Sequence, residues 1–301
     1  MLRKLLAVGL VVVFAHSISA AGGTPAATAT LTAAEIVSKN VAARGGLQAW
    51  RAVQTISESG KLGAGGDQRG MVAPPATPPP GSHSKAMPLP TSPRLAKEAQ
   101  LPFLMEMERP RKVRLELQFA GKTAIQVYDG MNGWKLRPYL NRLEVEPFTD
   151  EESRLASLQP DLDGPLVDYA AKGSRVELDG TEKVNDRNTY KIKVTTKSGE
   201  VQHIWIDAET FLEAKVEGQP RRLDGKMHPV EIYYKNYQTV SGLQFPFLFE
   251  THVLPAEDAG KGFRGTSYPP ETIALDKVQV NPKIDAALFT KPQIETATAQ
   301  R

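Results

Sequence analysis

The stretch Val113-Arg114-Leu115-Glu116-Leu117-Gln118-Phe119 alternates apolar and polar residues without exception. Successive side chains of a β-strand point to opposite faces, so this alternation is typical of a strand with one buried face. Similar stretches, joined by short turns, follow one another between Leu101 and Leu254. The sequence therefore predicts a large antiparallel sheet with one apolar face, which either the protein itself or a ligand must cover.

Short helices are expected around this sheet. Thr32 and Glu35 have the spacing of a capping box, and the helix that they begin ends at Gly45 and Gly46. The residues that follow form a short turn that places Trp50 inside. Two further short helices are expected, one after Thr149 and one at residues 166–170. The predicted fold class is mainly β (α+β), a curved antiparallel sheet with short covering helices.

The N-terminus has the pattern of a secretory signal. Arg3 and Lys4 precede an apolar run, and small residues at 19–21 suit cleavage after Ala21. We therefore expect a signal peptide at 1–21, a flexible N-terminus at 22–30, one domain at 31–291 and a flexible tail at 292–301. Because the apolar run is shorter than about 20 residues, the expected product is soluble, exported and not held by a membrane-spanning helix.

Residues 63–98 differ in composition from the rest of the chain. These 36 residues contain eight of the 23 prolines and five glycines, but no Phe, Tyr or Trp. Such a segment buries too little apolar surface to offset the entropy lost on ordering. We predict a disordered or extended insertion between two neighbouring strands of the same domain.

Composition excludes several classes of protein. The chain has no cysteine, so thiol catalysis, cysteine-based metal sites and a lipid-modified cysteine are excluded. It carries 37 basic and 34 acidic residues, without the strong basic excess of a nucleic-acid binder. No phosphate-binding glycine loop and no hydrolase motif is found. We expect no enzyme activity, no catalytic residue, no cofactor and no partner of the nucleic-acid class.

Metal and acid–base sites have only weak candidates. His203, His228 and His252 lie on or beside expected strands, but their spacing is not that of a metal site. Glu144 and Glu146 share one face of a strand, where a solvated charged face is the simpler interpretation. We therefore predict no metal site.

Large apolar and aromatic residues are the remaining candidates for function. The expected helices are few for a sheet of about ten strands, and each uncovered large side chain forgoes about 1.5–3 kcal/mol of burial. A lining of methionine and aromatic residues suits a promiscuous apolar cavity. The predicted cavity residues are Phe103, Met105, Met107, Leu115, Leu117, Phe119, Trp134, Trp205, Tyr234, Phe245 and Phe247. The predicted lid residues, within 149–173, are Leu155, Leu158, Leu166 and Tyr169.

Several motifs resemble those of the outer-membrane lipoprotein carrier (LolA/LolB-like) superfamily, and within it the outer membrane lipoprotein-sorting protein group. They are Ala34-Glu35-Ile36-Val37 with Gly45-Gly46 and Trp50, Tyr128-Asp129-Gly130 with Gly133-Trp134, residues 204–210, residues 233–237, and Gly242-Leu243-Gln244-Phe245-Pro246. The resemblance covers residues 31–291. It implies an incomplete barrel, lid helices and an apolar cavity for acyl chains.

Two functional hypotheses follow. The first is a periplasmic carrier or sensor, a monomer, whose partners are the acyl chains of lipids or lipoproteins, with transient contacts to envelope membrane proteins. The alternative is a non-enzymatic envelope module in which the sheet is fully self-packed and the Pro-rich arm binds a protein partner. Deleting residues 63–98 distinguishes them, because partner binding is lost only under the second hypothesis and lipid uptake persists under the first.

Overall fold

The structure, a computed structural model, describes residues 31–64, 99–138, 142–159, 161–223, 225–256 and 270–293. Contacts group the chain into residues 1–31 and 32–301, and the description below concerns the second unit. The expected signal peptide and flexible N-terminus lie outside the described residues, as do most of the Pro-rich insertion and of the tail. No helix in the described ranges is long and apolar enough to span a bilayer.

The helices of the described unit are few and short. Helix α1 (Ala33–Ala43) begins at Thr32, whose side chain and that of Glu35 form the expected capping box. Helix α2 (Leu47–Arg51) follows at once and buries Trp50. Helix α3 (Asp150–Leu158) begins with a second capping box between Thr149 and Glu152, and the 3₁₀ helix η2 (Ala286–Phe289) buries Phe289.

Thirteen strands account for most of the remaining residues. They are β1 (Thr55–Ala64), β2 (Ala99–Glu108), β3 (Lys112–Phe119), β4 (Lys122–Tyr128), β5 (Gly133–Arg137), β6 (Arg142–Pro147), β7 (Arg175–Val184), β8 (Arg187–Thr195), β9 (Val201–Asp207), β10 (Glu213–Leu223), β11 (Lys226–Val240), β12 (Leu243–Val253) and β13 (Glu271–Val280).

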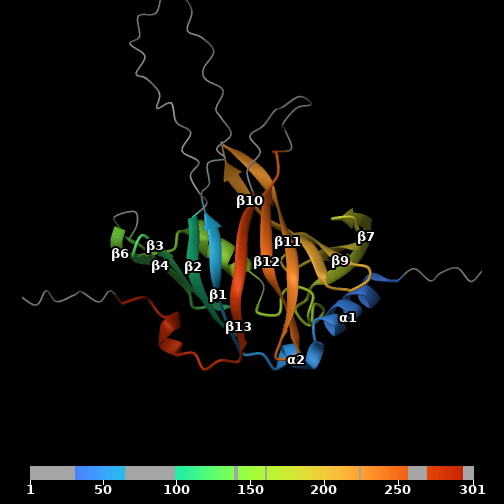
Figure 1. Ribbon diagram of the computed structural model, residues 1–301, viewed down its shortest axis with the longest axis horizontal. Coiled ribbons are helices and arrows are strands. Elements are labelled where there is room, and N and C mark those ends of the chain that lie inside the picture. The colour runs from blue at the N-terminus through green and yellow to red at the C-terminus, as the bar shows by residue number, and fades with distance from the viewer. Residues whose placement is uncertain are drawn as a thin grey trace, which may run out of the picture. The chain divides into compact units, whose positions relative to one another are not determined.

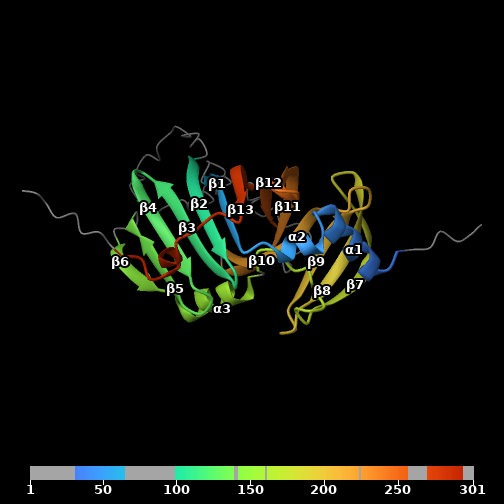
Figure 2. The same cartoon turned by 90° about the horizontal axis from the view of Figure 1, so that it is seen from below.

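All thirteen strands form a single antiparallel sheet in the order β6-β5-β4-β3-β2-β1-β13-β12-β11-β10-β9-β8-β7. The two edge strands, β6 and β7, do not pair with each other, so the described sheet is not closed. Figure 1 shows β1, β13 and β12 in the middle of the sheet, and Figure 2 shows the halves that end in β6 and β7 on opposite sides. The predicted fold class, an incomplete barrel with short helices, is confirmed.

Strand register assigns each side chain to one of two faces, and we call the face that carries the main core the inner face. On the inner face, Glu58 of β1 is paired with Met105 of β2, which is paired with Leu115 of β3. On the other side of β1, Glu58 is paired with Val278 of β13. Their neighbours along each strand point to the outer face, where Arg114 hydrogen-bonds to the Leu288 carbonyl of η2.

The main core lies on the inner face. It contains Trp50, Val53, Ile56, Phe103, Val167, Leu243, Phe245, Leu275 and Val278. The ring of Trp50 packs at 5.4 Å from that of Phe245, and its indole nitrogen donates a hydrogen bond to the Arg44 carbonyl. Helix α2 therefore covers one end of the inner face.

The second lid helix predicted at residues 166–170 is absent: residues 162–173 form a series of turns. Gly164 and Gly173 have positive φ, and so does Asp168, at 56°. Such values interrupt a right-handed helix. Leu166 and Val167 are nevertheless fully buried, because side-chain burial against the sheet does not require a helix.

Candidate functional site

An apolar strip runs along the inner face, and much of it is only half-buried. Side chains that pair across neighbouring strands form rows on this face. Met107 pairs with Ile56. Met105 and Leu115 lie in the row of Glu58, and Phe103 and Leu117 lie in the row of Gly60. The half-buried members of the strip are Leu62, Met105, Met107, Leu115, Leu117, Phe247, Phe249 and Ile273. A filled core would bury side chains of this size, so this part of the inner face remains incompletely covered.

Seven of the predicted cavity residues meet in this region. Phe103 and Phe245 belong to the buried core cluster, and Met105, Met107, Leu115, Leu117 and Phe247 pack against it. Tyr234 also lies on the inner face, opposite Phe249, with the two rings 5.2 Å apart and nearly perpendicular. Sequence alternation brought these residues to one face because each strand contributes every second side chain.

The remaining cover is a segment that we call the strap, residues 161–173. Leu166 and Val167 are fully buried, Val167 within the core cluster, and Leu162 packs against the same cluster. The strap therefore occupies the end of the inner face near Trp50 and Ile56, where the core is filled. The half-buried side chains extend from Met107, opposite Ile56, to the other end of the inner face near Leu62.

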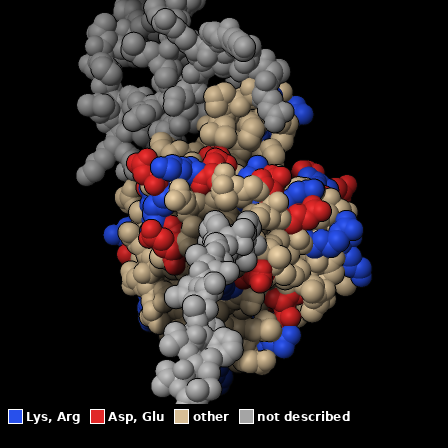
Figure 3. All heavy atoms as spheres, turned by 90° about the vertical axis from the view of Figure 1, so that its right-hand side faces the viewer, with Lys and Arg blue, Asp and Glu red and all other residues tan. Residues whose placement is uncertain are grey.

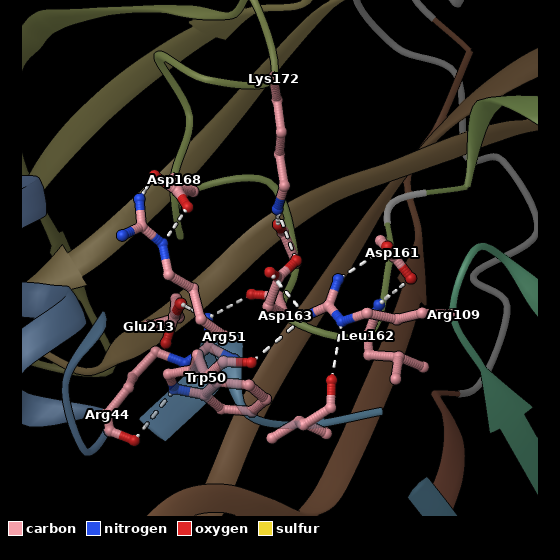
Figure 4. Close-up of polar contacts among 12 residues, drawn as sticks. Arg44, Trp50, Arg51, Arg109, Asp161, Leu162, Asp163, Asp168, Lys172 and Glu213 are labelled. Atoms are coloured by element: carbon pink, nitrogen blue, oxygen red, sulfur yellow. Dashed lines mark hydrogen bonds and ion pairs between the residues drawn. The ribbon is translucent and has the colours of Figure 1, made fainter. Parts of the chain in front are cut away.

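Arg109 holds the start of the strap (Figure 4). Its guanidinium forms ion pairs with Asp161 at 2.7 Å and Asp163 at 2.9 Å. It also donates to the carbonyls of Val53 and Trp50. Since Arg109 follows β2 and Val53 follows α2, one side chain ties the strap to both elements.

Two further cations, Arg44 and Arg51, complete the attachment of the strap, and Lys172 makes a contact within the strap itself (Figure 4). Arg44 donates to the Asp163 carbonyl at 3.0 Å, and Lys172 donates to the Gly164 carbonyl at 2.7 Å. Arg51 forms a bidentate pair with Asp168, at 2.6 and 2.8 Å, and these hydrogen bonds lower the pKa of the Asp168 carboxyl. The strap is thus held by charge-assisted hydrogen bonds at its edges and by apolar burial at its centre.

The space left beside the strap is small. A hollow of about 80 Å³ is lined by Arg44, Gly164, Pro165, Ile204, Glu213, Val216, Tyr234, Tyr237 and Pro246. A second, more open hollow of about 510 Å³ lies at the far end of β2, between Leu101 and the β3–β4 turn. Pockets for small molecules usually measure about 300–1,000 Å³, so the hollow beside the strap does not hold a lipid chain in this conformation.

Glu58 is the one acidic residue in the middle row of the apolar strip. Its neighbours across the sheet are Met105 and Val278, and burial raises the pKa of its carboxyl to about 7. No hydrogen bond or ion pair to Glu58 is found among the described residues. A carboxyl with such a pKa is partly protonated at pH 7, where an ordinary glutamate is fully ionised.

Tyr234 has comparable surroundings. Desolvation, followed by the negative charge of Glu213, raises the pKa of its phenol to about 12, and the charge of Glu58 acts in the same direction. Glu213 itself is paired with Arg44 at 3.2 Å and accepts a hydrogen bond from Tyr237. The hollow beside the strap therefore combines an apolar wall with the phenol of Tyr234 and a satisfied Arg44–Glu213 pair.

Trp134 does not join the other predicted cavity residues. It is paired with Val127, which is paired with Arg114, and so lies on the outer face. Lys135, the next residue, occupies the inner face and forms an ion pair with Glu152 of α3. Near Trp134 the strand sequence Gly133-Trp134-Lys135-Leu136 is too short to show which of its faces is buried.

Trp205 also lies on the outer face. Its neighbours are Lys191 and Lys215, and the Lys215 ammonium is 3.8 Å from the ring centroid. Its indole nitrogen donates to Glu182 at 2.8 Å. Trp205 is buried beneath charged side chains instead of lining an apolar cavity, since Ile204 and Ile206 on either side of it carry the alternation of the inner face.

The other predicted residues lie at the margins. Phe119 ends β3 and is 45% exposed beside the open hollow. Leu155 and Leu158 of α3 and Tyr169 of the strap are half-buried, whereas Leu166 is fully buried. Among the predicted lid residues only Leu166 is fully buried, next to Val167 of the core cluster.

The three histidines lie apart and in different surroundings. His203 contacts Glu217 at 2.8 Å, His252 lies near Glu250, and His228 is buried with its ring nitrogen 2.8 Å from the Leu254 carbonyl. In the described ranges no three His, Asp or Glu side chains are grouped as metal ligands. The surface in Figure 3 shows Lys and Arg interspersed with Asp and Glu, without a large area of one sign.

Sequence reasoning missed Arg44, Arg51 and Arg109, because their partners are more than 50 residues away in the chain. It also missed Glu58, for which a signal existed. Glu58 occupies an inner-face position of β1, two residues after Ile56 and four before Leu62, where the alternation calls for an apolar residue.

No protein-family model and no curated protein sequence matches the chain. Among solved structures, a DUF1329 family protein from Desulfovibrio piger has a TM-score of 0.50 and 11% identity, over 87% of this chain and 98% of the other. A LolA superfamily protein from Nitrosomonas europaea has a TM-score of 0.49 and 11% identity, over 87% and 99% of the two chains.

A domain from Vibrio parahaemolyticus described as outer membrane lipoprotein-sorting has a TM-score of 0.47 and 11% identity, over 86% and 96%. At this identity the match at 0.50 shows a shared fold and carries nothing about binding. The chain therefore shares the fold of the DUF1329 family protein, and the structures similar to it include a LolA superfamily protein.

Proposed function

We propose that this protein is a non-enzymatic periplasmic carrier or sensor that binds the acyl chains of a lipid or lipoprotein on the inner face of its sheet. The observation that carries the proposal is the half-buried apolar strip, which includes Met105, Leu115, Leu117 and Phe249. Exposed contiguous apolar surface is costly in water and marks a binding site in soluble proteins. The LolA-like fold agrees with this proposal.

Binding requires the strap to move. The hollow of about 80 Å³ beside Gly164 and Pro165 is too small for an acyl chain, and Leu166 and Val167 occupy the adjoining core. A chain that displaces these two side chains gains a largely apolar surface from Ile56 to Leu62, interrupted by Glu58. The strap is built of turns, and it is held by ion pairs at its edges and by the burial of Leu166 and Val167 at its centre, so these contacts must break for it to move.

The energetics of such binding are those of hydrocarbon transfer. Each methylene moved from water to the strip contributes about 0.8 kcal/mol, so ten methylenes contribute about 8 kcal/mol. The cost of displacing the strap and of ordering the ligand is subtracted from this sum. Apolar contact of this kind selects for chain length more than for the identity of the lipid.

One observation favours the alternative, an envelope protein-interaction module with a self-packed sheet. The filled core around Trp50, Val167 and Phe245 leaves little enclosed volume. Under this alternative the half-buried strip is ordinary surface and the strap never leaves it.

Uptake of a fluorescent fatty acid by the purified full-length protein tests the proposal. We expect saturable uptake, and organic extraction of protein isolated from membranes followed by mass spectrometry should identify lipid. Leu166→Ala should raise the affinity for the fatty acid, because a weaker strap is displaced at lower cost. Absence of both uptake and extracted lipid, in the wild type and in this variant, would contradict the proposal.

Deletion of residues 65–98 separates the two candidates. These residues join β1 to β2, which pair with each other directly, so a short linker preserves the sheet. Fatty-acid uptake should persist in the deleted protein if the strip is the binding site. Loss of a protein partner without any lipid uptake in either form would favour the interaction module.

A further inference from the structure

Glu58 lies at the border between the filled and the half-buried parts of the inner face. Ile56, two residues before it, is fully buried, and Leu62, four residues after it, is half-buried. Its side chain points to the same face as Met105 and Val278. An acyl chain lying along the strip would therefore pass over this carboxyl.

The other carboxylates near the strap are paired. Asp163 contacts Arg109 and Lys172, Glu213 contacts Arg44, and Asp168 contacts Arg51. Glu58 has no such partner within the described part of the chain, and the cause of its raised pKa is desolvation alone. The described surface around Glu58 thus lacks the cation or hydrogen-bond donor that a carboxylate in an apolar setting requires.

A carboxyl without a partner among the described residues costs stability, and a bound ligand could supply one. Part of the Glu58 surface is still accessible, so a bound molecule can reach it. An ammonium group beside a hydrocarbon chain would form a hydrogen bond with the carboxylate in which both groups are charged. A hydroxyl would form a weaker hydrogen bond, in which at most the carboxylate is charged. A ligand carboxylate would be repelled.

Resting on the proposed acyl-chain binding, we propose that Glu58 is the polar recognition group of the inner face. The amphiphile that it selects carries a cationic or hydrogen-bond-donating group beside its hydrocarbon chain. Apolar contact sets how tightly the chain is held, and Glu58 sets which polar end is accepted.

Three amphiphiles of equal chain length test this inference: a twelve-carbon amine, alcohol and carboxylate. Each displaces a fluorescent apolar probe from the full-length protein at about pH 8, where a carboxyl of pKa about 7 is ionised. The wild type should bind the amine most tightly and the carboxylate most weakly. The affinity for the amine should exceed the affinity for the carboxylate by about tenfold or more, as expected for one charge-assisted hydrogen bond.

Glu58→Gln keeps the size of the side chain and removes its charge, so the affinities for the amine and the carboxylate should differ by no more than about twofold. Glu58→Met, which leaves no acceptor, should give the same loss of ranking. Glu144→Gln, at an exposed glutamate of β6, is the matched control and should keep the wild-type ranking.

The outcomes separate this inference from the function on which it rests. If all three amphiphiles bind and the ranking is the same with and without Glu58, the recognition role is overturned and acyl-chain binding stands. If none binds to the wild type or to the Glu58 variants, the proposed function is overturned, and the recognition role with it.

Discussion

Replacement of Glu58 by glutamine should make the protein more stable at neutral and alkaline pH, with no gain at acid pH. Burial raises the pKa of this carboxyl from its ordinary value of 4.5 to about 7 in the folded state. Below pH 4.5 both the folded and the unfolded chain hold the proton, so this carboxyl does not make the free energy of unfolding depend on pH there. Between 4.5 and about 7 the unfolded chain releases the proton first, and stability falls as the pH rises.

The size of the effect follows from this interval. At about 1.36 kcal/mol per pH unit, the difference between 4.5 and about 7 amounts to about 3 kcal/mol of lost folding free energy, fully reached above pH 7. Glu58→Gln has no proton to release, so this fall is absent from the variant. The difference in stability between variant and wild type should therefore grow by about 3 kcal/mol between acid and alkaline pH.

Urea denaturation of both proteins across this pH range measures the effect. Taking the difference at each pH cancels the titration of all other groups, which the two proteins share. Glu144→Gln, on the exposed edge strand β6, should follow the wild-type curve. A difference between Glu58→Gln and wild type that stays constant with pH would refute the claim that this carboxyl is desolvated.

Further predictions concern the strap and the two faces of the sheet. Leu166→Ala removes a fully buried side chain and should lower the free energy of unfolding by about 2–5 kcal/mol, measured by urea denaturation. Arg109→Met breaks two ion pairs of the strap and should lower the free energy of unfolding by about 2 kcal/mol or more, with faster hydrogen exchange at residues 161–173. Arg154→Met is the control, because the ion pair of Arg154 is exposed, and it should change the free energy of unfolding by less than about 0.5 kcal/mol. Leu115→Gln on the inner face should weaken the affinity for a fluorescent fatty acid by about tenfold, whereas Trp134→Gln on the outer face should leave this affinity unchanged. Equal losses of affinity in both variants would contradict the assignment of the two faces.

Local patterns predicted the elements of this fold well where they depend on neighbouring residues. The capping boxes at Thr32 and Thr149 begin helices as expected, because their hydrogen bonds close within four residues. The alternation in residues 113–119 predicted both a strand and the inner-face positions of Leu115 and Leu117. Period-two patterning is a property of the backbone and needs no tertiary information.

The same reasoning was wrong where a pattern fitted two structures. Leu166 and Val167 are buried as expected, but within turns, because a short run of apolar residues does not distinguish a helix from a buried loop. Trp134 and Trp205 were assigned to the cavity by their size alone. Each lies on the outer face, since the face that a strand buries is set by its register with the neighbouring strands.

The amino-acid sequence by itself determined the antiparallel sheet, its short helices and most of the apolar strip, because these follow from residue periodicity and capping within a few residues. The tertiary structure alone decided that the strap lies across the inner face, through ion pairs such as Arg109–Asp161 that join residues 52 positions apart. It also decided that Glu58 faces apolar side chains, with no partner in the ranges that the structure describes, since desolvation depends on side chains that only the folded sheet brings together.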